Sequence, residues 1–251
     1  MHRIIVVWIA LALLTAPLAA QEEEAVKTDP NTVKKAAALF DKGVQAAQKG
    51  DLNGAEQLFQ QSLKTYPLVP GAYVELGKIA MARQNPAQAV EFYLKARDTY
   101  HILHDQKLKD LNRVQNEERQ RAQNSQTARS STSGSGGFAK NAVIESRNQM
   151  AEDQRDIVQE QQEADIPALF YLYLGGAYMR LGKHDLAEQE FTAGIRRDPG
   201  LAPLHFNLAV VHLVKGRYDQ SATEARTARD LGFQLPPQFV QDLESRGKLK
   251  L

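Results

Sequence analysis

The sequence contains no cysteine at all. A disulfide framework and thiolate zinc sites are therefore excluded, and so is lipidation of an N-terminal cysteine. An excess of charge of one sign is also lacking, because 31 lysines and arginines face 30 aspartates and glutamates, for a formal net charge of +1. Without a basic field, neither nucleic acid nor an acidic lipid surface is expected as a partner.

Long apolar runs are absent except at the N-terminus, where one extends from Ile4 to Leu14. It follows the basic Arg3 and precedes a stretch of small residues that ends at Ala20, which is the pattern of a secretory signal peptide cleaved near Ala20. The run is shorter than the ~20 residues that a spanning helix needs, and Pro17 interrupts its extension. We therefore expect a periplasmic or secreted protein with no lipid anchor, associated with the membrane only if the signal peptide is uncleaved.

The strongest positive signal is an internal repeat with a period of 34 residues. The residues that keep this spacing are Gly43 and Gly77, Ala55 and Ala89, Phe59 and Tyr93, Gly175 and Ala209, Tyr178 and His212, and Pro199 and Phe233. Within each copy, apolar residues follow the three-and-four spacing of a helix, and turn residues such as Gly50 and Gly182 divide the copy into two. The pattern predicts paired helices.

These residues resemble the tetratricopeptide repeat, whose copies run W-x2-L-G-x2-Y, then a small residue, an aromatic and a closing proline. Counted in this way, the copies start at Ala36, Pro70, Ala168 and Ala202. The third copy matches best, with Leu174, Gly175, Tyr178, Gly182, Ala187, Phe191 and Pro199. No copy carries the tryptophan, whose place is taken by Leu39, Tyr73, Tyr171 and His205.

A long polar insertion separates the second copy from the third. From Gln115 to Gly137 no apolar residue is larger than alanine, so no helix face there suits a solenoid core. The insertion is interpreted as two polar helical arms, 98–124 and 139–163, around a flexible serine-glycine linker. A thin stripe of Val143, Met150 and Ile157 leaves two alternatives open, a solvated excursion or an ordered, coiled-coil-like hairpin.

The expected fold is all-α: a solenoid of four helix-turn-helix repeats, interrupted by the polar helical hairpin and closed by a C-terminal capping helix. We favour docking of the two pairs of repeats across the base of the insertion. The expected segments are a signal peptide (1–20), a flexible leader (21–31), repeats 1 and 2 (32–103), the insertion (104–167) with its linker (130–137), repeats 3 and 4 (168–235), and the capping helix and tail (236–251).

Histidines are the first candidates for chemistry. His205 and His212 occupy repeat positions that normally hold packing aromatics, so we expect them to be buried. His101 and His104 are expected to face a junction without a cleft. Because no constellation of nucleophile, base or metal ligands emerges, the sequence predicts no catalytic residues, no metal site and no cofactor, and hence no enzyme.

The resemblance implies that the first helix of each copy lines a concave groove that binds other proteins. The groove positions are Phe40, Val44, Val74, Lys78, Met81, Leu169, Leu172, Met179, Phe206, Asn207, Val210 and Leu213. Their largely apolar character favours a peptide or helix over a chain-terminal carboxylate. The expected function is an exported scaffold or adaptor for an envelope partner. The alternative is a structural subunit of an envelope complex that assembles with its own copies through the insertion.

Overall fold

The computed structural model describes residues 29–130 and 164–246, with side chains up to 124 in the first part. In these two ranges the chain is helical apart from short connections. The helices are α1 (Pro30–Gln48), α2 (Leu52–Thr65), α3 (Pro70–Ala82), α4 (Pro86–Ser130), α6 (Ala168–Arg180), α7 (His184–Arg197), α8 (Ala202–Val214), α9 (Tyr218–Asp230) and α10 (Pro237–Ser245). The expected signal peptide, most of the leader, most of the linker and the second arm lie outside the described residues.

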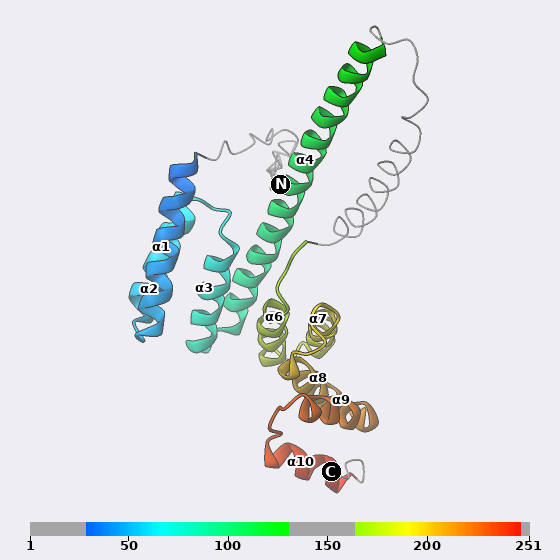
Figure 1. The fold of residues 1–251 in the computed structure, drawn as a ribbon. Helices are drawn as coiled ribbons and strands as arrows, with labels where there is room; N and C mark the ends of the chain where they lie inside the picture. Colours follow the sequence, from blue (N-terminus) through cyan, green and yellow to red (C-terminus); the bar gives the residue numbers. More distant parts are fainter. Residues whose placement is uncertain (1–28, 131–163, 247–251) are drawn as a thin grey trace, which may run out of the picture.

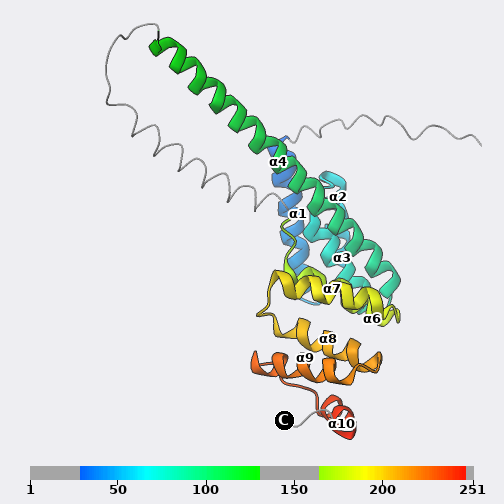
Figure 2. The same ribbon diagram turned by 90° about the vertical axis from the view of Figure 1, so that its right-hand side faces the viewer.

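The helices form four antiparallel pairs, α1 with α2, α3 with α4, α6 with α7 and α8 with α9. Figures 1 and 2 show the pairs stacked in chain order, with α10 after the last one. This arrangement confirms the all-α, tetratricopeptide-like solenoid. In the described part of the chain no helix is both long enough and apolar enough to cross a membrane.

Each of the first three pairs is held together by a glycine that faces an aromatic ring. A Cβ placed on Gly43 would lie 2.6 Å from Phe59, and a Cβ on Gly175 would lie 2.7 Å from Cδ1 of Phe191. Both rings are fully buried. The glycine therefore lets the two helices approach closely enough for the ring to fill the space between them.

The turn inside each pair requires a left-handed residue. Glycine supplies it in three pairs, with φ of +84° at Gly50, +69° at Gly182 and +74° at Gly216. The second pair has Gln84 there, with φ of 58°. A residue with a Cβ pays a steric penalty in this region, so the turn between α3 and α4 is strained.

Repeats 2 and 3 pack directly on each other, although the insertion separates them in sequence. A single apolar cluster contains buried residues of α3, α4, α6, α7 and α8. The ring of Phe170 on α6 meets two rings of α4 edge to face, with centroids 6.4 Å from Tyr93 and 6.1 Å from Tyr100. The two pairs of repeats therefore form one continuous solenoid, as the favoured docking model predicted.

Several boundaries differ from those expected. The leader was expected to run to residue 31, but α1 begins at Pro30, because the side chain of Asp29 accepts a hydrogen bond from the backbone N–H of Asn31 and caps the helix. Helix α4 continues without a break from repeat 2 into the insertion. At the other end of the insertion, Ala164 and Ile166 are buried in the solenoid core.

Candidate functional site

The predicted groove residues are distributed along the whole solenoid, and none of them is fully buried. They pack at the edges of three apolar clusters. Phe40 and Val44 belong to the N-terminal cluster, Val74, Met81, Leu172 and Met179 to the central one, and Phe206, Val210 and Leu213 to the C-terminal one. Lys78, Leu169 and Asn207 lie outside these clusters.

The N-terminal part of the groove contains a hollow of ≈ 310 Å³ between α1 and α3. Val44 and Lys78 both line it, so the structure brings these two predicted residues together. The ammonium group of Lys78 donates to the Glu75 carboxylate at 2.8 Å and lies 5.5 Å from the centroid of the Tyr173 ring on α6. Lys78 thus links the two central repeats, and its charge is partly compensated within the groove.

The middle of the groove, on α6, is the most open part. Leu169, Leu172, Gly176 and Met179 follow the three-and-four spacing and share one face of this helix. Leu169 is 47% exposed, and a Cβ on Gly176 would meet no atom within 4 Å. An exposed apolar side chain and a position without a side chain therefore lie on the same face of α6, about two helical turns apart.

The C-terminal part of the groove is covered by the chain itself. The ring of Phe206 stacks on Phe233 at a centroid distance of 4.7 Å and meets Phe239 of α10 edge to face at 5.2 Å. Asn207 donates its side-chain N–H to the carbonyl oxygen of Pro203 on its own helix at 2.8 Å. In the fourth repeat, these predicted groove residues therefore support the end of the solenoid.

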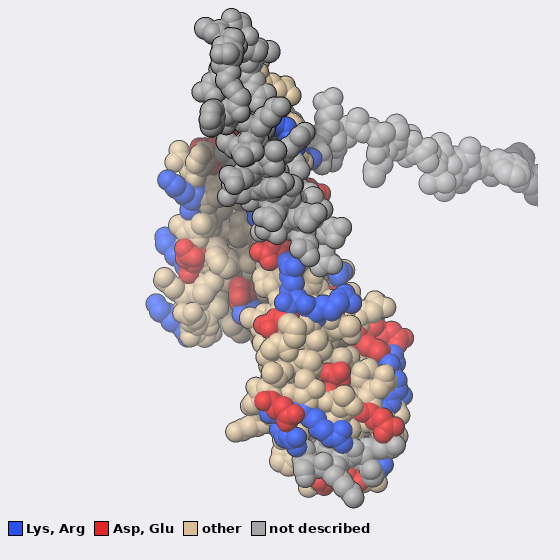
Figure 3. Space-filling view, turned by 45° about the vertical axis from the view of Figure 1, so that its right-hand side comes forward, with Lys and Arg blue, Asp and Glu red and all other residues tan. Residues whose placement is uncertain are grey.

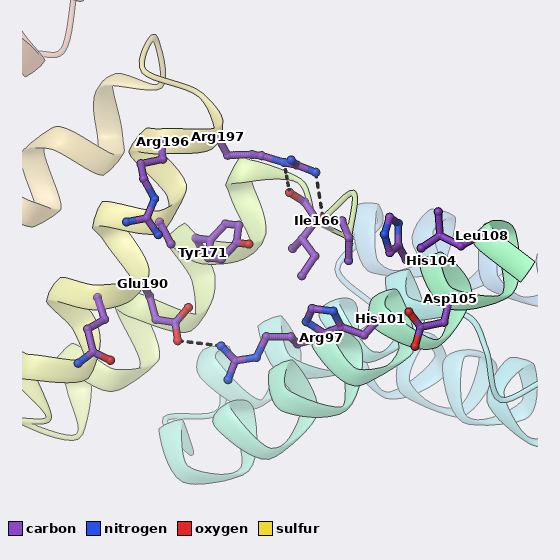
Figure 4. A pocket seen from close by; sticks show the side chains of 13 residues that line it. Arg97, His101, His104, Asp105, Leu108, Ile166, Tyr171, Glu190, Arg196 and Arg197 are labelled. Atoms are coloured by element: carbon purple, nitrogen blue, oxygen red, sulfur yellow. Dashed lines mark hydrogen bonds and ion pairs between the residues drawn. The ribbon is translucent and has the colours of Figure 1, made fainter. Parts of the chain in front are cut away.

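Sequence reasoning missed a cavity of ≈ 810 Å³ between α4 and α7. His101 and His104 line it, so the expectation that they face no cleft is wrong. Figure 4 shows α4 on one side of the cavity and α7 on the other, with Ile166 between them. No local signal reveals such a site, because its walls come from segments some 90 residues apart in sequence.

Two of the arginines in this cavity are fixed by the protein. Arg97 of α4 donates to the buried carboxylate of Glu190 on α7 at 3.0 Å. Burial raises the pKa of the Glu190 carboxyl, and the Arg97 guanidinium opposes this rise. Arg197 donates to the carbonyl oxygens of Ala164 at 2.9 Å and Ile166 at 3.3 Å, and so anchors the connection that enters α6.

Two further histidines of the repeats, His205 and His212, serve packing. His205 is buried, with Nδ1 2.7 Å from a Glu224 carboxylate oxygen and Nε2 3.1 Å from the Pro199 carbonyl oxygen. His212 is buried as well, and burial lowers its pKa. Within the two described ranges, no group of three or more histidine and carboxylate side chains is placed to hold a metal ion.

Surface charge is mixed. On the face drawn in Figure 3, basic and acidic side chains lie close together over the C-terminal repeats. Between α7 and the turn that joins α8 to α9, for example, Glu188 accepts hydrogen bonds from Arg217 at 2.8 Å and from Lys215 at 2.7 Å. Such pairing agrees with the near-zero net charge and provides no large field of one sign.

Comparison with solved structures finds other helical-repeat proteins. The Pseudomonas aeruginosa protein pilF is 15% identical with a TM-score of 0.39, over 87% of this chain and 88% of that chain. PilW, described as a type IV pilus biogenesis factor, is 13% identical with a TM-score of 0.43, over 85% and 86%. YrrB, described as having an unusual peptide-binding site, is 16% identical with a TM-score of 0.31, over 84% and 92%. These likenesses concern the fold alone.

The comparison with curated proteins gives no match. The family model for the tetratricopeptide repeat matches residues 40–100, 162–202 and 172–234, which together make up more than half of the sequence. These ranges contain helices of all four pairs. The chain therefore belongs to the tetratricopeptide repeat family, and its architecture is that of a protein-interaction scaffold.

Proposed function

We propose that this protein is an exported scaffold that binds a peptide or helix of an envelope protein in its concave groove. The observation that carries the proposal is the open face of α6, which holds the exposed Leu169 and, about two helical turns further along, Gly176 with open space where a side chain would be. Exposed apolar side chains on a rigid surface favour contact with a partner, and the missing side chain at Gly176 allows a partner residue to approach the helix closely.

The groove favours an apolar segment with limited charge. Its predicted residues are mostly aliphatic or aromatic, and Glu75 already binds Lys78, the cation among them. An amphipathic helix or an extended peptide presents apolar side chains at regular intervals and suits such a surface. The C-terminal part is filled by α10, so we assign the contact to repeats 1 to 3.

Site-directed photo-crosslinking in the producing cell tests the groove. A photoreactive phenylalanine analogue replaces Leu169 or, as a matched control, Leu186, which is 38% exposed on α7 and outside the groove. The proposal expects a discrete cross-linked partner from position 169 alone, and loss of this product on adding Gly176→Leu. Equal products from both positions, or a product that survives Gly176→Leu, would count against the groove.

Export is tested separately by sequencing the N-terminus of the protein recovered from the envelope fraction. The proposal expects a mature chain that begins at Gln21, directly after the small-residue stretch. An intact Met1 on the recovered protein would contradict cleavage, whatever the result of the crosslinking.

A second candidate function is self-assembly through α4. Leu111 and Val114 are 39% and 47% exposed on this helix, and together with Leu103 they line a hollow of ≈ 430 Å³. Light scattering of the purified chain tests self-assembly. If the chain assembles through this face, it should form an oligomer, and Leu111→Glu should dissociate that oligomer. A monomer at high concentration would refute self-assembly and leave the groove proposal intact.

A further inference from the structure

The cavity between α4 and α7 is formed mainly by the second helices of repeats 2 and 3 and is separate from the groove residues. We propose that it binds a short acidic segment of a partner protein, in which glutamate or aspartate side chains alternate with apolar ones. This site neither depends on the groove nor follows from it.

Size and lining favour a peptide over a simple anion. The volume of ≈ 810 Å³ lies within the range of roughly 300–1,000 Å³ that is typical of ligand sites. Leu108 from α4, Ile166 from the connection, and Tyr171 from α6 provide apolar surface beside the charged groups. A segment with both carboxylates and apolar side chains satisfies both parts of the lining.

One arginine of the lining, Arg196, has no charged or hydrogen-bonding partner among the described residues, so it can bind a carboxylate of a ligand. Arg97 is bound to Glu190 and Arg197 to the connection, so neither needs an external carboxylate. Arg196, also on α7, makes no hydrogen bond or ion pair to any residue that the structure describes. A guanidinium is planar and presents paired N–H donors, which makes it the side chain best suited to bind a carboxylate.

Two acidic residues in a hollow that Arg196 also lines are already bound to other cations. Arg196 also borders a hollow of ≈ 520 Å³ that is lined by Asp185 and Glu188. Both carboxylates are already bound to Lys215, and Glu188 binds Arg217 in addition. Lys215 and Arg217, in the turn between α8 and α9, therefore compensate the negative charge on that side of Arg196.

The opposite wall offers two further polar groups. His101 and His104 lie on α4, across the cavity from α7, as Figure 4 shows. Each imidazole can donate an N–H to a carboxylate oxygen. Asp105 lies beside them on the same helix, and it makes no ion pair with the described residues. The negative charge of Asp105 repels an acidic ligand, so removing this charge should strengthen binding, whereas removing the charge of Arg196 should weaken it.

Fluorescence anisotropy of the full chain with a fluorescein-labelled peptide of alternating glutamate and leucine tests the site. Arg196→Gln is expected to weaken binding about tenfold, because a charge-assisted contact is lost. Asp105→Asn is expected to strengthen binding about threefold, as for removal of one exposed like charge. Neither variant should change the melting temperature, since both side chains are exposed and unpaired among the described residues.

Controls separate a specific site from general charge attraction. Arg180→Gln removes an arginine that is also exposed, at the end of α6 and outside this cavity, and should leave the affinity unchanged. A peptide with glutamine in place of glutamate should not bind. The proposal is overturned if Arg180→Gln weakens binding as much as Arg196→Gln, if the glutamine peptide binds equally well, or if the glutamate peptide shows no saturable binding. Gly176→Leu, which blocks the groove, should not affect the result.

Discussion

Two adjacent glycines on α6, Gly175 and Gly176, allow the contribution of close helix packing to stability to be measured by comparing two variants. Gly175 faces Phe191, and a Cβ added there would lie 2.7 Å from Cδ1 and 2.9 Å from Cζ of the ring. Gly176 is the next residue, and its Cβ would meet nothing within 4 Å. We therefore predict that Gly175→Ala and Gly176→Ala change the stability in different ways, although the chemical change is the same.

The magnitude follows from two effects. Replacing glycine by alanine inside a helix stabilises it by about 0.5–1 kcal/mol, and this gain applies equally to both positions. Forcing a methyl group into a packed core costs about 1–3 kcal/mol, and this cost applies to Gly175 alone, because the Phe191 ring is fully buried. The difference between the two variants, in which the helix propensity cancels, should therefore be about 1–3 kcal/mol.

Thermal unfolding followed by circular dichroism measures this difference. For a chain of 150–250 residues, 1 kcal/mol corresponds to roughly 2–4 °C, so Gly176→Ala should melt roughly 2–12 °C above Gly175→Ala. Adding Phe191→Leu to Gly175→Ala should cost less than Phe191→Leu alone, because the smaller side chain makes room for the methyl group. Equal melting temperatures for the two alanine variants would refute the packing argument.

Three further predictions concern the turn, the surface network and the junction. Gln84→Gly should raise the stability by about 1 kcal/mol, because it removes a left-handed residue with a Cβ, and thermal unfolding checks it. The hydrogen bond from Arg217 lowers the pKa of Glu188 from 4.5 to about 2. The stability advantage of the native chain over Glu188→Gln should therefore be full above about pH 4.5 and disappear as the pH falls toward 2, in melts recorded across this range. Arg97→Met leaves the Glu190 carboxylate, with 11% of its side chain exposed, without its partner, which should cost about 3 kcal/mol. Adding Glu190→Gln should restore part of the loss in chemical denaturation.

The repeats were predictable because their determinants are local. Each glycine and the ring that it faces are 16 residues apart, as in Gly43 with Phe59 and Gly175 with Phe191, so one copy contains both partners. The fourth repeat has the same pair of positions, 16 residues apart, but with different residues. There Ala209 takes the place of the glycine, and Ala225 takes the place of the aromatic, and both alanines are fully buried in the C-terminal cluster.

The course of α4 was only partly predictable. The period of the repeat placed the end of repeat 2 at residue 103, and a separate polar helical arm was expected at 98–124; a single helix spans both and continues to Ser130. Neither glycine nor proline occurs between Tyr100 and Ser130, so nothing in the local sequence ends the helix. The absence of glycine and proline therefore favours one continuous helix over a helix end at residue 103.

The predicted groove shows where repeat position alone is insufficient. Leu169 and Phe206 both hold groove positions, yet Leu169 is 47% exposed, whereas Phe206 packs against the rings of Phe233 and Phe239. The difference comes from α10, which follows the fourth repeat and covers its first helix. Whether a groove residue is available to a partner therefore depends on the next helix in the stack.

The return of the chain into repeat 3 explains how the solenoid tolerates the insertion. Ala164 and Ile166 precede α6 and belong to no repeat pattern, yet both are buried in the central cluster. Burial of a side chain such as that of Ile166 contributes roughly 1.5–3 kcal/mol, and the hydrogen bonds from Arg197 hold the connection in place. The contacts of Phe170 with Tyr93 and Tyr100 join α6 to α4 directly, and Ala164 and Ile166 of the connection are buried in the same apolar cluster. The same anchored connection forms one wall of the cavity beside Arg196, so the position of the proposed second site is a consequence of how the insertion is closed.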